Sequence, residues 1–281
     1  MSRGSVLSTF GSIAAVSLTG CASARAVRNR LSGRCAQDAP PPPARDVVIV
    51  RGVVPTRRVR APVHFAIAVP GGASIDAVAY LLPGRGSTAT AAFDVLGFDG
   101  FLAAAVSAGV RPFAIAAMDA GESYFHVRRS GEDRLGVATV DLPRVVRKAL
   151  GKPTLREALI GMSMGGYGAL LAAEMQPARY RSVAVAGPAI FASYEDENRS
   201  VGDAFDDRAD FARHDVVVRG AALRNRPVLV HIGDSDPFVP GVRAFGKACP
   251  TAMIEVTRGC HDDGFWRLTA FEMISFVGKH F

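Results

Sequence analysis

The sequence predicts an α/β fold with a mostly parallel central sheet and helices on both faces. Apolar runs of strand length recur along the chain, and stretches with helical patterning lie between them. This alternation is typical of a parallel sheet covered on both sides, and no internal repeat or coiled-coil heptad competes with it. The expected strands are 47–50, 65–69, 77–82, 113–118, 157–160, 183–186, 228–232 and 253–257.

The first two runs are short and adjacent, which indicates a hairpin at one edge of the sheet. Helices are expected at 98–107 and 142–150, and a small-residue helix at 166–175 should end before Pro177. The segment 192–226 differs in composition, because it is rich in Asp, Glu and Arg with interspersed aromatic residues. We expect it to be a cap-like insertion in one domain that covers 45–281, a length with ample core for independent stability.

One serine lies in the pattern that a nucleophile elbow requires. Ser163 is the central residue of Gly161-Met162-Ser163-Met164-Gly165, between the apolar run 157–160 and the helix 166–175. The glycines permit a strained turn that presents the serine hydroxyl at the carboxyl edge of the sheet. The motif alone is weak evidence, and it gains weight only if an acid and a histidine follow in that order.

Both residues follow, each just after an expected strand. Asp236 lies in the turn after 228–232, and His261 lies in the loop after 253–257. In this arrangement His261 is the general base, and Asp236 fixes its tautomer and stabilises the imidazolium. Asp234 is the rival acid, and a polar loop residue remains the alternative interpretation of His261.

An oxyanion hole needs two backbone N–H donors near the nucleophile. The first should be the N–H of Met164, directly after the serine, and the second should come from the loop after the strand 77–82. That loop begins Pro83-Gly84-Arg85, so we assign the second donor to the N–H of Arg85. An ordinary glycine-rich turn is the alternative.

Two aromatic residues near these motifs are candidates for the substrate pocket. Tyr124 follows the strand 113–118, and Trp266 follows His261. Either could instead be ordinary packing, and the insertion 192–226 could equally be a solvated helical excursion.

Taken together, these motifs resemble the esterase D-like family of α/β-hydrolases, which includes carboxylesterases, feruloyl-esterase-type enzymes and bacterial mycolyltransferases. The resemblance covers about 45–281, and it implies Ser163, Asp236 and His261 as the catalytic triad with Arg85 and Met164 as oxyanion donors. This sequence departs from the family in having Pro83, where the family often has His or Asp. An Asp as the acid favours hydrolysis, since the mycolyltransferases carry Glu. The segments that carry the resemblance are 80–86, 118–124, 161–168, 233–240 and 260–266.

The N-terminus resembles an export signal of the bacterial lipoprotein type. A positive start and a modest apolar stretch precede Leu18-Thr19-Gly20-Cys21, which matches a lipobox with Cys21 as the acylated residue. We expect 1–20 to be the signal and 21–44 to be a Pro- and Arg-rich tether, which would place the protein in the cell envelope or outside the cell. A leader that is not exported remains the alternative.

The net charge of +7 does not indicate nucleic-acid binding. Residues 1–60 contain ten arginines and only two acidic residues, so this segment carries +8 and the remainder carries −1. Arginines on a tether are better explained by attraction to an anionic membrane or envelope surface, and we expect no nucleic-acid partner.

The four cysteines are too few for a disulfide scaffold. If Cys21 is lipidated and Cys35 lies on the tether, Cys249 and Cys260 remain to form a disulfide across the last expected strand, with two reduced thiols as the alternative. The acidic residues around His261 match no structural zinc pattern, so no metal site is expected.

The sequence therefore predicts a serine carboxylester hydrolase that acts through an acyl-enzyme on a small-molecule or lipid ester, such as a lipid or an acylated sugar. Such a reaction needs no cofactor. Two alternatives stay open: an envelope acyltransferase that uses the same acyl-enzyme, and a non-catalytic envelope-binding module.

Overall fold

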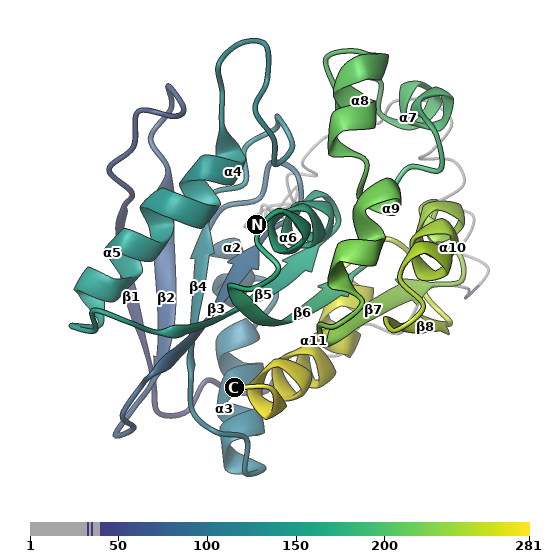
Figure 1. Ribbon diagram of the computed structural model, residues 1–281. Coiled ribbons are helices and arrows are strands. Elements are labelled where there is room, and N and C mark those ends of the chain that lie inside the picture. The colour runs from purple at the N-terminus through teal and green to yellow at the C-terminus, as the bar shows by residue number, and fades with distance from the viewer. Residues whose placement is uncertain (1–32, 34, 36–39) are drawn as a thin grey trace, which may run out of the picture.

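The computed structural model describes residues 33, 35 and 40–281, so the expected signal, Cys21 and most of the tether lie outside the described residues. Eight strands form one sheet in the order β1-β2-β4-β3-β5-β6-β7-β8 (Figure 1). The predicted α/β-hydrolase fold with a mostly parallel sheet is confirmed. The strands are β1 (Val47–Val53), β2 (His64–Pro70), β3 (Ala77–Leu82), β4 (Ala114–Met118), β5 (Arg156–Met162), β6 (Tyr180–Ala186), β7 (Val228–Gly233) and β8 (Met253–Thr257).

The first two strands form the expected hairpin at one edge. β1 pairs antiparallel with β2, and β2 pairs antiparallel with β4. The pairs from β4 through β3, β5, β6 and β7 to β8 are all parallel. The carboxyl ends of β5, β7 and β8 therefore meet at the same edge of the sheet.

Each face of the sheet has its own apolar core, because successive side chains of a strand point to opposite faces. In β3 the side chains of Val78, Tyr80 and Leu82 belong to one core, and those of Ala79 and Leu81 belong to the other. All six residues of β3 are buried. Burial on both faces explains why this strand is a continuous apolar run rather than an alternating one.

Helices cover both faces (Figure 1). One face carries α2 (Ala91–Asp94), α3 (Phe98–Ser107) and α11 (Asp263–Lys279), and the other carries α5 (Leu142–Ala149), α6 (Met164–Met175) and α10 (Val239–Ala248). A short α4 (Arg134–Gly136) and a π-helical turn (Val137–Asp141) lead into α5. None of the helices in the described part of the chain is long and apolar enough to cross a bilayer.

The segment between β6 and β7 contains only short helices. These are α7 (Tyr194–Ser200), α8 (Arg208–His214), α9 (Val216–Arg219) and a 3₁₀ turn (Gly220–Leu223). We refer to residues 192–226 as the cap segment.

Candidate active site

Ser163 occupies a strained turn between β5 and α6. Its φ is 53° and its ψ is −124°, a region that residues with a side chain rarely adopt. A Cβ on Gly161 would lie 2.3 Å from the carbonyl oxygen of Gly165, and a Cβ on Gly165 would lie 1.9 Å from that of Leu82. Both positions therefore exclude any side chain, which is the physical reason for the Gly-x-Ser-x-Gly pattern here.

A chain of two hydrogen bonds links Ser163 to the interior. Ser163 Oγ lies 2.8 Å from His261 Nε2, and His261 Nδ1 lies 2.7 Å from Asp236 Oδ2. The Asp236 side chain is fully buried, and its other oxygen accepts the Phe238 N–H at 2.8 Å. A carboxylate beside Nδ1 holds the proton on that nitrogen, which leaves Nε2 free to accept the serine proton.

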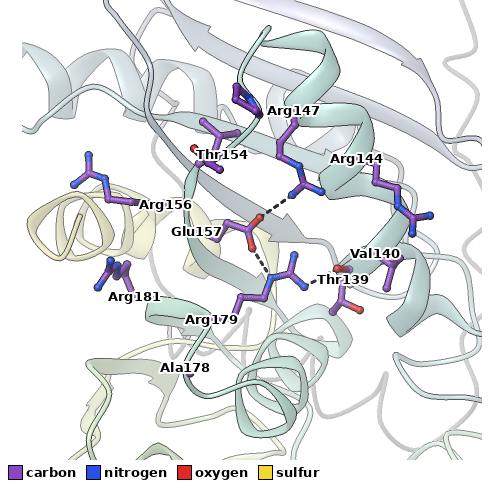
Figure 2. Close-up of a pocket in the computed structure, with 12 residues that line it drawn as sticks. Thr139, Val140, Arg144, Arg147, Thr154, Arg156, Glu157, Ala178, Arg179 and Arg181 are labelled. Carbon is purple, nitrogen blue, oxygen red and sulfur yellow. Dashed lines mark hydrogen bonds and ion pairs between the residues drawn. The ribbon is translucent and has the colours of Figure 1, made fainter.

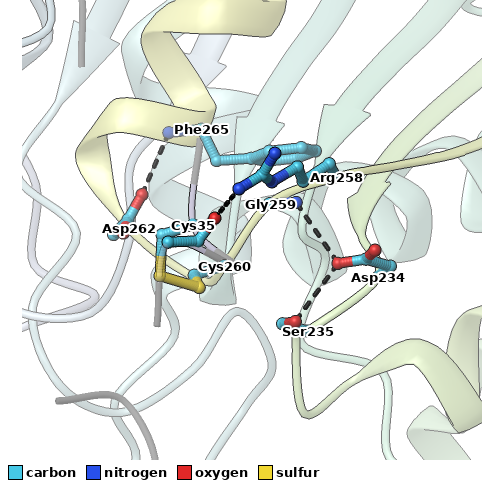
Figure 3. Close-up of a disulfide and its surroundings, with 9 residues drawn as sticks. Cys35, Asp234, Ser235, Arg258, Gly259, Cys260, Asp262 and Phe265 are labelled. Carbon is cyan, nitrogen blue, oxygen red and sulfur yellow. Dashed lines mark hydrogen bonds between the residues drawn. A yellow bond between two sulfur atoms is a disulfide. The ribbon is translucent and has the colours of Figure 1, made fainter. Parts of the chain in front are cut away.

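Asp234, the rival acid, has a different set of partners. Its Oδ1 accepts hydrogen bonds from the Ser235 hydroxyl at 3.2 Å and from the Gly259 N–H at 3.4 Å (Figure 3). Asp234 thus joins the loop after β7 to the loop after β8, and Asp236 is the carboxylate that contacts His261.

The loop after β3 lies against the turn that holds the serine. A Cβ on Gly84 would lie 3.5 Å from the Cβ of Ser163, so the backbone before Arg85 passes directly beside the nucleophile. Met164 is the first residue of α6, and its N–H therefore has no acceptor within the helix. This placement is compatible with the two N–H donors that the sequence predicts, at Arg85 and Met164.

The side chain of Arg85 binds the cap segment. Its two terminal nitrogens donate to both oxygens of Asp203 at 2.8 and 2.7 Å, and its Nε donates to Glu122 at 2.8 Å. These hydrogen bonds lower the pKa of the Asp203 carboxyl below its usual value. A bidentate arginine–carboxylate pair fixes orientation as well as distance, so the loop beside Ser163 and the cap segment are held together.

Three further acids of the cap segment have basic partners on the loop after β4. They pair as Asp206 with Arg128, Asp207 with Arg129 and Asp210 with His126. Burial lowers the pKa of His126 to about 4, so at neutral pH the ring is uncharged and donates its Nε2–H to Asp210 at 3.1 Å. The acidic composition of the cap segment thus serves to attach it to the rest of the domain.

Aromatic rings flank the imidazole of His261. The ring centroids of Phe238 and Trp266 lie 5.2 and 5.5 Å from that of His261. Phe238 was not among the residues predicted from the sequence, although its position two residues after Asp236 was a usable signal. Tyr124 is only 2% exposed and packs beneath the cap segment, with its ring 5.7 Å from that of Tyr167.

Comparison with known proteins identifies the family. A sequence model described as "Putative esterase" matches residues 98–261, which is more than half of the chain. The chain belongs to this esterase family. It is an α/β-hydrolase of the esterase D-like type and a carboxylic ester hydrolase.

A curated relative of the esterase is an S-formylglutathione hydrolase from Paracoccus denitrificans (strain Pd 1222). The two sequences are 35% identical over 105 residues, which is 36% of this chain and 37% of that protein. The match therefore spans little more than a third of the curated relative.

Solved structures show the same fold at low sequence identity. A ferulic acid esterase superposes with a TM-score of 0.72 at 18% identity, covering 84% of this chain and 100% of that one. An S-formylglutathione hydrolase from Agrobacterium tumefaciens superposes with a TM-score of 0.71 at 16% identity, covering 87% and 99%.

The disulfide of the esterase corrects one prediction. Cys260 is bonded to Cys35 across 225 positions (Figure 3). Cys249 is a buried free thiol. The predicted pair of Cys249 and Cys260 was wrong because β8 lies between them. A five-residue strand spans roughly 17 Å, whereas the Cα atoms of a disulfide lie within about 7 Å of each other.

The disulfide joins the tether to the residue directly before His261. Arg258 adds a second link, because its guanidinium donates to the carbonyl oxygen of Gly33. The sequence predicts that Cys35 lies on the tether, and no local pattern connects it with position 260.

Three groups of described residues could offer ligands to a metal ion, with ligand atoms within 4.8 Å of one another. They are Cys35, Cys260 and Asp262; His126, Asp210 and His214; and His231, Glu255 and Glu272. Both sulfur atoms of the first group are in the disulfide, and Asp210 of the second accepts several hydrogen bonds. None of the groups includes Ser163, Asp236 or His261.

Proposed function

We propose that the esterase hydrolyses its ester through an acyl-enzyme on Ser163, with His261 as general base and Asp236 as the residue that orients it. The observation that carries this proposal is the chain of hydrogen bonds from Ser163 Oγ through His261 to the buried Asp236. The strained backbone of Ser163 supports it, because strain at a polar residue is common where chemistry requires a fixed geometry.

The reaction has two halves. Ser163 Oγ attacks the acyl carbonyl while its proton passes to His261 Nε2, and the oxyanion accepts hydrogen bonds from the N–H groups of Arg85 and Met164. The C–O bond to the alcohol then breaks, and the alcohol leaves with the proton from Nε2. Water attacks the acyl-enzyme in the same way, releases the acid and restores the serine hydroxyl.

The substrate we propose is a carboxylic ester of the lipid or acylated-sugar type. The rings of Phe238 and Trp266 beside His261 provide apolar surface for an acyl or aryl group. The relatives are named for a formyl thioester and for ferulic acid esters, which indicates that acyl preference varies on this fold.

The test combines a substitution with an active-site probe. Ser163→Ala should abolish turnover of p-nitrophenyl esters and labelling by a fluorophosphonate, while the thermal unfolding midpoint stays close to that of the wild type. The matched control is Ser130→Ala, which removes an exposed hydroxyl and should change neither readout. Wild-type turnover across a series of acyl chain lengths then identifies the acyl group. Labelling that persists in Ser163→Ala would show that another residue is the nucleophile.

We propose further that the protein is exported and anchored through Cys21. The Cys35–Cys260 disulfide supports export, because disulfides persist mainly in oxidising compartments. Two or more acyl chains on Cys21 would hold the protein stably, and the basic tether would add a salt-sensitive attraction to anionic lipid. Cys21→Ala should release the protein from the membrane fraction, and mass spectrometry that finds an unmodified Cys21 in the native host would contradict this proposal.

A further inference from the structure

A charged hollow of about 560 Å³ lies at the edge of the sheet opposite Ser163. We call it the arginine hollow, because five of the residues that line it are Arg144, Arg147, Arg156, Arg179 and Arg181. Figure 2 shows Arg147 and Arg179 directed toward Glu157, with Arg144 farther out on α5 and Arg156 and Arg181 farther out at the starts of β5 and β6.

The lining carries much more positive than negative charge. The lining contains five arginines and one carboxylate, Glu157, so its formal charge is +4. The sequence from residue 61 onward sums to −1, so this charge is a local concentration and not a general property of the domain.

The carboxylates around the hollow are already shared. Glu157 accepts from both Arg147 and Arg179, and Asp76 accepts from both Arg156 and Arg111. Each of these acids therefore balances only one of its two guanidinium groups.

Two arginines at the rim are not held in close ion pairs. Arg144 is 70% exposed and lies 3.4 Å from Asp141, which Arg58 and Thr56 already contact more closely. Arg181 is exposed, and no carboxylate in the described part of the chain pairs with it. Both can turn toward a ligand without breaking a close ion pair.

Glu157 preorganises the interior of the hollow. Its side chain is only 9% exposed and also accepts a hydrogen bond from the buried Tyr80 hydroxyl at 3.1 Å. It therefore fixes the positions of Arg147 and Arg179, and Arg179 is held further by the carbonyl oxygen of Thr139 at 2.6 Å. Two guanidinium groups fixed side by side in this way can donate to the oxygens of a phosphate group.

We propose that the arginine hollow binds a phosphate-bearing anion with two or more negative charges. Such a ligand would relieve the repulsion among the guanidinium groups and accept hydrogen bonds from several of them. It is not the ester substrate, because Arg156 begins β5 and Ser163 follows its end, and a strand of seven residues separates the two sites by roughly 20 Å. The phosphate group could belong to a soluble anion or to a lipid headgroup.

The test measures binding of pyrophosphate to the full-length protein by calorimetry at low ionic strength. Arg144→Gln with Arg181→Gln removes two charges from the rim and leaves the partners of Glu157 in place. We expect saturable binding at one site in the wild type. Binding by the double variant should be weaker by about tenfold or more, because the ligand loses charge-assisted hydrogen bonds from two guanidinium groups. Ester turnover should be the same in the wild type and the double variant. A failure to bind pyrophosphate can therefore be distinguished from a failure of the proposed ester hydrolysis.

The matched control is Arg60→Gln with Arg243→Gln, which removes two exposed arginines that do not line the hollow. Sedimentation with phosphatidylcholine vesicles, with and without phosphatidylglycerol, distinguishes a lipid headgroup from a soluble anion as the source of the phosphate group. The ligand is a lipid headgroup if the protein is retained on the anionic vesicles, if this retention depends on Arg144 and Arg181, and if pyrophosphate competes with it. The ligand is a soluble anion if the protein binds pyrophosphate but is not retained on the vesicles. If neither probe binds saturably, or if both double variants lose binding equally, the proposal is wrong.

Discussion

Replacing Cys35 with serine should destabilise the domain by up to about 5 kcal/mol. The disulfide closes a loop of 225 positions, and in the chain-entropy model a loop of that length restricts the unfolded chain by about 5 kcal/mol. Measured disulfides commonly contribute about 2–4 kcal/mol, so we expect a loss of that size. The loop that carries His261 keeps its hydrogen bonds to Asp234 and Asp236, so most of the esterase activity should remain below the unfolding transition.

The assay is urea denaturation, with and without a reductant, on the wild type and two single variants. Reductant should lower the free energy of unfolding of the wild type to that of Cys35→Ser and should have no further effect on this variant. Cys249→Ala is the matched control, since Cys249 is a buried free thiol; its stability should remain sensitive to reductant. If Cys249→Ala abolishes the sensitivity and Cys35→Ser retains it, our assignment of the disulfide is refuted.

Three further predictions test the catalytic geometry and the buried charge. Asp236→Asn should lower kcat for p-nitrophenyl esters by about 10³–10⁴, because the imidazole would adopt the wrong tautomer. Asp234→Asn should retain most of the activity in the same assay. If Asp234→Asn were the more damaging change, the acid would be Asp234. Gly165→Ala should lower both esterase activity and thermal stability, because its Cβ would lie 1.9 Å from the Leu82 carbonyl oxygen. Gly246→Ala should lower neither, because its Cβ would meet only ordinary van der Waals contacts. Equal effects of the two substitutions would show that the backbone at Gly165 has room to adjust. Burial raises the pKa of Glu174 to about 9, so this carboxyl stabilises the fold below its unfolded-state pKa, and that stability is lost as pH rises toward 9. Glu174→Gln should therefore flatten the pH dependence of urea unfolding between pH 5 and 9, and an unchanged slope would contradict the raised pKa.

The strands could be predicted from the sequence because most are buried on both faces. Continuous apolar runs such as 77–82 are typical of strands that helices cover on each side of a sheet, and the structure reproduces that run without change. β1 extends three residues beyond its prediction, because an edge strand is half-exposed and its last residues, through Val53, are defined by pairing with His64.

The helix α11 was not predicted, although its signal was present. Its buried residues include Phe265, Thr269, Met273 and Val277, which recur every four positions as in a helix with one apolar face. The glycines and acidic residues around His261 are typical of a loop. The Asp262 side chain caps the helix that begins there by accepting the Phe265 N–H.

Contacts between distant segments could not be predicted. The order of the motifs predicts Asp236 as the acid with Asp234 as its rival, and the contact of Asp236 with His261 is seen in the fold. The ion pair between Arg85 and Asp203 spans 118 positions, and neither residue has a local pattern that indicates the other. The arginine hollow likewise forms only when α5, β5 and β6 come together.

The Cys35–Cys260 bond has a consequence for reach and orientation if Cys21 is anchored in a membrane. The free part of the tether between the anchor and the domain then ends at Cys35 rather than at the start of β1. These 14 residues extend at most about 50 Å. The tether is attached beside His261, so the opening of the active site would be turned toward the membrane that holds the anchor. The arginine hollow, at the other end of β5, would face away from that membrane and toward whatever anions lie beyond it.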